Sequence, residues 1–145
     1  MGDRCYLSMR FRKVDTPRVC EFFDEDLATF ERGLTDNQDG TVTLEENEAN
    51  YGYSDVRDCM AQAGIIFEGF HGAGDDYGEA LFCSFDGVSY DADSIFQSGD
   101  PAVSVDRDTG EINEAQLNRV REFVEARKKA LAYLAADQPQ EVPAC

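Results

Sequence analysis

Apolar and polar residues alternate near the N-terminus of this chain and later recur at helical spacing. Within residues 5–13 the apolar side chains occupy every second position, a period typical of a half-buried strand. The apolar residues that follow recur every three or four positions, which predicts one amphipathic helix over residues 17–32. Pro17 suits the first helical position and Gly33 suits the position after the last turn. The chain therefore opens with a strand followed by a helix.

The middle of the chain predicts short strands around one short helix. We predict an edge strand at 41–49, a helix at 55–63 capped by Ser54, a strand at 65–70, and a hairpin at 79–92 that turns at Asp86-Gly87. A glycine-rich loop at 71–78 separates the last two elements. This part of the chain is therefore expected to build most of a sheet.

The C-terminal part predicts a second hairpin and a long helix. The hairpin covers residues 102–113, and the helix covers residues 113–134 with Asn113 as its N-cap. Residues 136–145 are polar and contain proline, so we predict a disordered tail. The order of elements favours a single α+β domain over residues 1–135, with a mostly antiparallel sheet and two to three helices packed on one face. A ferredoxin-like core with an added hairpin is one version of this architecture.

Charge is distributed very unevenly along the sequence. The 145 residues carry 30 acidic and 13 basic side chains, a formal net charge of −17. The basic residues cluster towards the two ends, and no Lys or Arg occurs from Asp58 to Asp106. Excess like charge destabilises a compact state through self-repulsion, so the bias indicates a function for the acidic middle of the chain.

Composition also excludes several classes of protein. The sequence has neither an apolar run long enough to span a bilayer nor the apolar core of a secretory signal, so we expect a cytoplasmic protein without a membrane role. Its five cysteines are odd in number, widely spaced and without a C-x-x-C pair, which argues against a zinc site or a disulfide framework. We expect no cofactor, four cysteines in apolar surroundings, and an exposed thiol at Cys145. Direct binding to nucleic acid is not expected, because the field of the chain repels a polyanion.

The stretch TDNQDGTVTLEE, residues 35–46, is similar in part to a calcium-binding loop. With Gly40 at the sixth position of an EF-hand loop, Asn37, Asp39 and Glu46 fall at positions 3, 5 and 12. Thr35 then occupies the first position, where a carboxylate is needed, and the residues that follow make a poor exiting helix. We interpret the stretch as a polar turn, with a cation-binding module at these three residues as the alternative function.

The sequence contains no recognisable catalytic constellation. His71 is the single histidine and lies in the glycine-rich loop close to Asp75 and Asp76. That loop lacks the spacing and the lysine of a phosphate-binding motif, and no nucleophile motif occurs elsewhere. We therefore predict that the protein is not an enzyme and that His71 is a hydrogen-bonded loop residue.

In size, charge and lack of a catalytic motif, the chain resembles DNA-mimicking inhibitors of restriction, CRISPR and repair enzymes. The resemblance implies an anti-CRISPR-like or anti-restriction-like protein that blocks the basic groove of a nucleic-acid-binding protein, and a phage or plasmid origin would fit it. The residues expected to bind the partner are Asp24, Glu25, Asp26, Glu31, Glu45, Glu46, Glu48, Asp75, Asp76 and Tyr77. A structural or oligomerising protein that uses the C-terminal helix is a further alternative, and the oligomeric state stays open.

Overall fold

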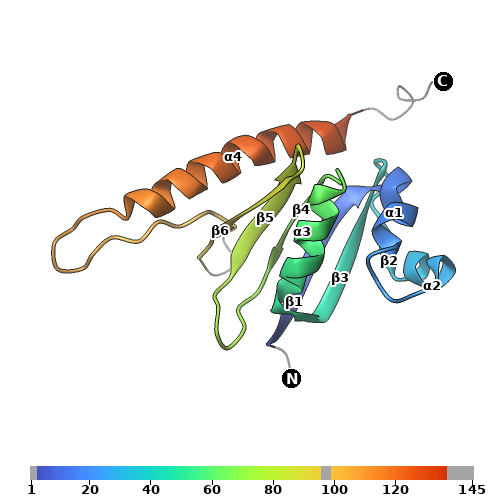
Figure 1. The fold of residues 1–145 in the computed structure, drawn as a ribbon, viewed down its shortest axis with the longest axis horizontal. Helices are drawn as coiled ribbons and strands as arrows, with labels where there is room; N and C mark the ends of the chain where they lie inside the picture. The colour runs from blue at the N-terminus through green and yellow to red at the C-terminus, as the bar shows by residue number, and fades with distance from the viewer. Residues whose placement is uncertain (1–2, 96–98, 137–145) are drawn as a thin grey trace.

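The computed structural model describes residues 3–95 and 99–136, which form a single-domain α+β fold (Figure 1). Six antiparallel strands make one sheet in the order β2-β3-β1-β4-β5-β6. The strands are β1 (Arg4–Arg12), β2 (Leu34–Asp36), β3 (Thr41–Asn50), β4 (Phe67–His71), β5 (Ala80–Phe85) and β6 (Val88–Asp93). The helices are α1 (Thr16–Cys20), α2 (Leu27–Arg32), α3 (Ser54–Gln62) and α4 (Glu114–Ala135), with 3-10 turns at Lys13–Asp15 and Tyr51–Tyr53. The predicted fold class is confirmed.

One face of the sheet, which we call the three-helix face, carries Leu7, Met9 and Phe11 of β1. These side chains are buried against residues of α1, α2 and α3, together with Phe67 of β4 and Phe82 of β5. Alternation along β1 produces this arrangement, because every second side chain of a strand points to the same face. The expected two to three helices on one face are therefore α1, α2 and α3.

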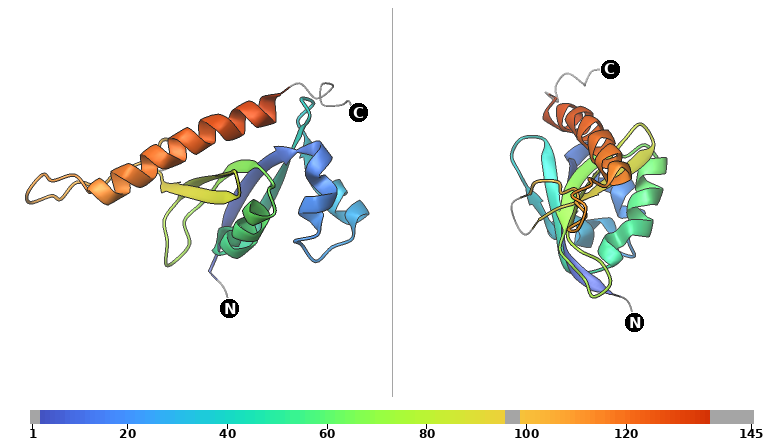
Figure 2. Two further views of the ribbon diagram at one scale, coloured as in Figure 1. Left: turned by 45° about the horizontal axis from the view of Figure 1, so that its top comes forward. Right: turned by 90° about the vertical axis from the view of Figure 1, so that its left-hand side faces the viewer.

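The opposite face, which we call the α4 face, carries Tyr6, Ser8 and Arg10 of β1 and is covered in part by α4. Phe123 of α4 packs against Cys83 of β5 in a second, smaller cluster of buried residues. Figures 1 and 2 show that α4 stands apart from the three shorter helices and that its N-terminal end reaches beyond the sheet, as does the loop before it. Helices therefore cover both faces of the sheet, although unequally.

The first four strands follow a recognisable element order. β1, helix, β2, β3, helix and β4 succeed one another along the chain, and β1 lies between β3 and β4 in the sheet. A β-α-β-β-α-β order is the one that the ferredoxin-like arrangement has. The β5–β6 hairpin extends the sheet beyond β4, and α4 is added on the opposite face. A ferredoxin-like core with an added hairpin stays our interpretation of this order.

The helix predicted over residues 17–32 is wrong as a single element. The chain instead forms α1 and α2, separated by turns and bends at residues 21–26. Asp26 starts the second helix as an N-cap, since its carboxylate accepts a hydrogen bond of 2.9 Å from the backbone N–H of Thr29. A side chain that caps a new helix competes with continuation of the previous one, so the local acidic sequence overrides the apolar spacing.

Several smaller predictions also differ from the structure. β3 lies between β2 and β1, so the strand predicted at the edge is internal and the three-residue β2 forms the edge instead. The predicted hairpin at 102–113 is reduced to one bridge between Val105 and Ile112. The N-cap of α3 is Tyr53, whose backbone is in the left-handed region, and not the expected Ser54. Cys59 is exposed, whereas an apolar environment was expected. The predicted tail and its exposed thiol lie outside the described residues, apart from Ala136.

Other predictions are confirmed almost to the residue. The predicted first strand is β1, and the hairpin at 79–92 is β5 and β6 with its turn at Asp86-Gly87. The C-terminal helix is α4, and the Asn113 side chain accepts a hydrogen bond of 3.0 Å from the backbone N–H of Gln116. These elements carry strong local signals, either a turn dipeptide or a cap.

Candidate binding surface

Acidic side chains from three segments gather at one corner of the three-helix face. This acidic corner consists of Glu21, Glu25, Asp26, Glu31 and Glu46, and the predicted residue Asp24 is exposed in the same connection between α1 and α2. Burial raises the pKa of the Cys20 thiol, and the charges of Glu25, Asp26, Glu31 and Glu21 raise it further. Burial likewise raises the pKa of Tyr53, followed by the charges of Glu46 and Glu25. Glu46 of β3 and Glu25 of the α1–α2 connection therefore both act on one tyrosine, although 21 positions separate them in the sequence.

No described basic side chain forms an ion pair with the acidic corner, although Lys13 lies near Glu31: its hydrogen bond to Asp36 raises the pKa of Lys13, and the charge of Glu31 raises it further. The described basic side chains form their ion pairs elsewhere: Lys13 with Asp36 at 2.9 Å, Arg4 with Glu48 at 3.2 Å, and Arg10 with Glu68 at 3.1 Å. Within residues 3–95 and 99–136, no ion pair involves a carboxylate of the acidic corner. This concentration of negative charge therefore faces solvent and can attract a cationic partner over a distance.

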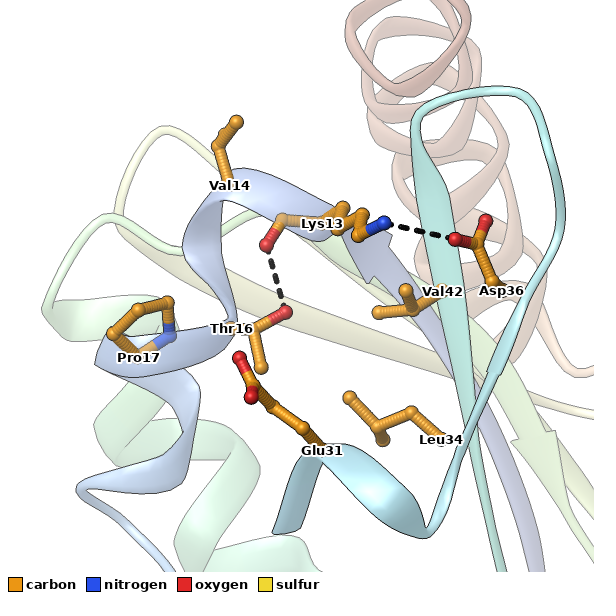
Figure 3. A pocket seen from close by; sticks show the side chains of 8 residues that line it. All are labelled: Lys13, Val14, Thr16, Pro17, Glu31, Leu34, Asp36 and Val42. Atoms are coloured by element: carbon orange, nitrogen blue, oxygen red, sulfur yellow. Dashed lines mark hydrogen bonds and ion pairs between the residues drawn. The ribbon is translucent and has the colours of Figure 1, made fainter. Parts of the chain in front are cut away.

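A groove of about 480 Å³ adjoins the acidic corner between α1, α2 and the β2–β3 hairpin (Figure 3). Leu34 and Val42 give it apolar walls, while the ion pair of Lys13 and Asp36 lies along one side. The carboxylate of Glu31 points into the groove, so this residue belongs to both the groove and the acidic corner. Apolar walls with a charged rim match the anatomy of protein–protein interfaces.

An exposed valine marks the mouth of the same groove. Val14 is 68% exposed in the 3-10 turn that leads into α1 and lines the groove with Pro17. The hydroxyl of Thr16 donates a hydrogen bond of 2.7 Å to the carbonyl of Lys13 and so holds this turn in place. Sequence reasoning did not identify the groove, because its walls come from four segments that only the folded chain brings together.

The remaining predicted partner-binding residues do not join the acidic corner. Glu45 precedes Glu46 on β3 and therefore points to the α4 face, where its charge contributes to the raised pKa of Tyr6 after burial. Glu48 is held by Arg4 near the end of β3. Of the three predicted partner-binding residues on β3, Glu46 therefore lies on the three-helix face and Glu45 on the α4 face, while Glu48 forms an ion pair with Arg4.

Asp75, Asp76 and Tyr77 form a separate group in the glycine-rich loop. The backbone N–H groups of Asp75 and Asp76 donate hydrogen bonds of 2.8 and 2.7 Å to the carboxylate of Asp3, and the Tyr77 hydroxyl donates to the Asp3 carbonyl at 3.0 Å. These bonds attach the loop to the start of β1. The carboxylates of the two loop aspartates are exposed, whereas Tyr77 is partly buried.

The stretch that resembled a calcium loop is the turn of the β2–β3 hairpin. Asn37 donates from its amide to the hydroxyls of Thr41 and Thr43 at 3.0 and 2.9 Å, and Asp39 accepts from the backbone N–H of Thr41 at 3.0 Å. Glu46 lies farther along β3, opposite Leu7 of β1. No group of three or more metal-ligating side chains occurs in the part of the chain that the structure describes.

His71 is a buried side chain on the three-helix face. Its ring stacks on Phe82 at 6.2 Å and meets the edge of Tyr77 at 5.5 Å, while Nδ1 lies 2.8 Å from the Gly72 carbonyl. Burial lowers the pKa of His71, and the nearby Arg57 lowers it further. Asp75 and Asp76 are exposed, and no described hydrogen bond joins their carboxylates to the imidazole.

No protein-family model, curated protein or solved structure matches the chain significantly. Among the described helices, none combines the length and the apolar character needed to cross a membrane.

Proposed function

We propose that this chain is a cytoplasmic, non-catalytic binding protein whose acidic corner occupies a basic groove of a nucleic-acid-binding protein and thereby inhibits it. The observation that supports this proposal most strongly is the gathering of Glu25, Glu31 and Glu46 from three segments without an ion pair among the described residues. A nucleic-acid-binding groove is lined with Lys and Arg that match phosphate charge, and rigidly held carboxylates can take the place of phosphates.

The formal net charge of −17 gives the proposed association a kinetic advantage. A strong field of one sign steers an oppositely charged partner and raises its association rate, and added salt screens the effect. The proposal therefore requires binding that weakens steeply with ionic strength. It also requires competition by DNA, because both ligands would occupy the same groove.

The groove beside the acidic corner supplies the apolar part of the proposed interface. A side chain of the partner can enter between Leu34 and Val42 while its basic neighbours meet Glu31. Interfaces concentrate their binding energy in a few such anchors, whereas rim charges mainly control the association rate and the choice of partner.

The test is a pull-down with the whole chain as bait, eluted in steps of rising salt and then with double-stranded DNA. A bait with Glu25→Lys, Glu31→Lys and Glu46→Lys is compared with wild type. The matched control carries Asp108→Lys, Glu111→Lys and Glu122→Lys, three exposed positions away from the acidic corner. Because both variants have the same net charge, a difference in binding between them reflects the position of the charges and not their total.

We expect the wild-type and control baits to retain a nucleic-acid-binding protein that DNA displaces, and the acidic-corner variant to lose it. Retention by both variants, or a partner that neither salt nor DNA displaces, would overturn the proposal. Thermal unfolding of all three baits shows whether lost binding reflects lost structure.

A further inference from the structure

The α4 face contains a second hollow, of about 320 Å³, where α4 does not cover the sheet. Tyr6 of β1, Phe70 of β4 and Leu81 of β5 line it from three adjacent strands. Phe70 pairs with Leu81 across β4 and β5, and its ring centroid lies 5.8 Å from that of Tyr6. Phe70 is 45% exposed, so one aromatic wall of the hollow is open to solvent.

Glu79 carries the one carboxylate among the residues that line this hollow. Glu79, just before β5, lines the hollow, and its Oε1 atom is buried without a hydrogen bond from any described residue. A buried carboxylate oxygen without a partner is unfavourable, because the hydration that it loses on folding is not replaced. A cationic group in the hollow beside Glu79 would offset the negative charge of this carboxylate.

The walls around Glu79 favour an organic cation over a metal ion. Metal ions such as calcium need six or more oxygen ligands, whereas the residues that line this hollow include one carboxylate and two aromatic rings that contact each other. Substituted ammonium groups are instead attracted to the faces of aromatic rings, the recognition used by aromatic cages for choline and methylated amines. The volume lies at the lower end of the range of small-molecule sites.

We propose that this hollow binds a small organic cation, with its ammonium group beside Glu79 and its alkyl groups against Tyr6 and Phe70. The ligand class is an alkyl- or trimethylammonium compound free in solution. The site lies on the face opposite Glu46 and Leu34, so it does not depend on the proposed inhibitory function.

The test is calorimetric titration of the whole chain at physiological ionic strength with three probes: tetramethylammonium, choline and the uncharged choline isostere 3,3-dimethyl-1-butanol. We expect saturable binding of the two cations and affinity at least about tenfold lower for the neutral compound. Glu79→Gln and Phe70→Ala should each weaken choline binding by about tenfold or more. Glu122→Gln, an exposed change on α4 with the same effect on net charge as Glu79→Gln, should leave binding unchanged.

Two further measurements locate the binding site and test whether its ligand is a free small molecule or part of a peptide. Choline should shift the amide resonances of Phe70, Gly72 and Leu81 and leave those of α2 unchanged. Equal affinity for the neutral isostere, unchanged binding in Glu79→Gln, or no saturable heat up to millimolar cation would each overturn the proposal. If a lysine-containing peptide binds and no free cation does, the proposal that the ligand is a small molecule free in solution would be overturned.

Discussion

The two faces of the sheet differ in both packing and charge. On the three-helix face, Phe11, Phe67 and Phe82 are fully buried in one large cluster with residues of three helices. On the α4 face, Phe123 is the one buried aromatic side chain of the smaller cluster, and its buried neighbours from α4 are Ala126 and Ala130. The first face therefore contributes most of the buried apolar surface, while the second retains open surface that can bind a ligand.

The distribution of charge follows the same division and explains the sequence pattern. Arg10 near the N-terminus and Arg127 near the C-terminus approach Glu68 of β4 at 3.1 and 3.8 Å on the α4 face. Arg12 of β1 lies over the ring of Tyr133 at 4.7 Å. The two basic ends of the chain thus meet on the α4 face, whereas the acidic corner lies on the three-helix face. Part of the separation seen along the sequence therefore becomes a separation in space, although Lys13 lines the groove beside Glu31 and Glu68 lies among the arginines.

The largest expected effect comes from removing an aromatic side chain from each face. Phe67→Ala should lower the free energy of unfolding by about 3–5 kcal/mol, because the ring is fully buried and packs edge-on against Phe82 at 5.9 Å. Phe123→Ala should cost less, since a helix that packs with alanines on one face can move into the space. Urea unfolding of both variants measures the difference.

Leucine at each of these positions provides the control, because it restores most of the buried volume. A greater loss for Phe123→Ala than for Phe67→Ala would contradict the view that the three-helix face contributes most of the stability.

The sequence predicts the elements with strong local signals better than their arrangement. The strict alternation of β1, the Asp86-Gly87 turn and the Asn113 cap each act within a few residues, and each appears as predicted. The break between α1 and α2 was missed because apolar spacing continues across it, while the cap at Asp26 decides the structure.

The candidate sites could be predicted only as a list of acidic residues. Glu45 and Glu46 are neighbours in the sequence, yet alternation along β3 sends them to opposite faces. The hollow at Glu79 needs Tyr6 and Phe70 from two other strands, and the register of those strands is not visible in the sequence. Tertiary pairing, which local patterns do not encode, therefore decides which side chains meet.

The ion pairs at Glu68 offer a smaller test of the α4 face. Glu68→Gln should lower the free energy of unfolding by about 1–3 kcal/mol. The change removes the partly buried carboxylate with which both Arg10 and Arg127 form ion pairs. The control is Glu125→Gln, which breaks a pair with Lys128 that is exposed on both sides and should change stability very little. Equal effects of the two changes in urea unfolding would show that Glu68 does not join α4 to the sheet.

The cap of α4 should matter less and act locally. Asn113→Ala should cost about 1 kcal/mol, because it removes the acceptor for the Gln116 amide. The first buried side chain of α4 is Phe123, so the preceding turns depend on the cap more than on packing. Faster amide hydrogen exchange in these turns, reversed in Asn113→Asp, is the expected result. Faster exchange across the three-helix face would contradict the independence of the two faces.

The smallest expected effect is a pH dependence that belongs to the three-helix face. His71 is the single histidine of the chain, and burial followed by the charge of Arg57 lowers its pKa below the usual 6.5. The Gly72 carbonyl and the carboxylates of Asp91 and Asp93 oppose this shift but do not reverse it. The folded state therefore favours the neutral imidazole, and the unfolded chain binds a proton more readily.

The sign of the effect follows from this difference in proton binding. The stabilisation from neutral His71 is fully present above pH 6.5 and is lost as the pH falls from 6.5 through the lowered pKa. Urea unfolding between pH 7 and pH 5 should thus show falling stability in the wild type and a flatter profile in His71→Gln. The aspartates whose pKa is lowered, such as Asp26 and Asp39, titrate below this window. An identical slope in His71→Gln would mean that protonation of His71 is not coupled to folding of the three-helix face.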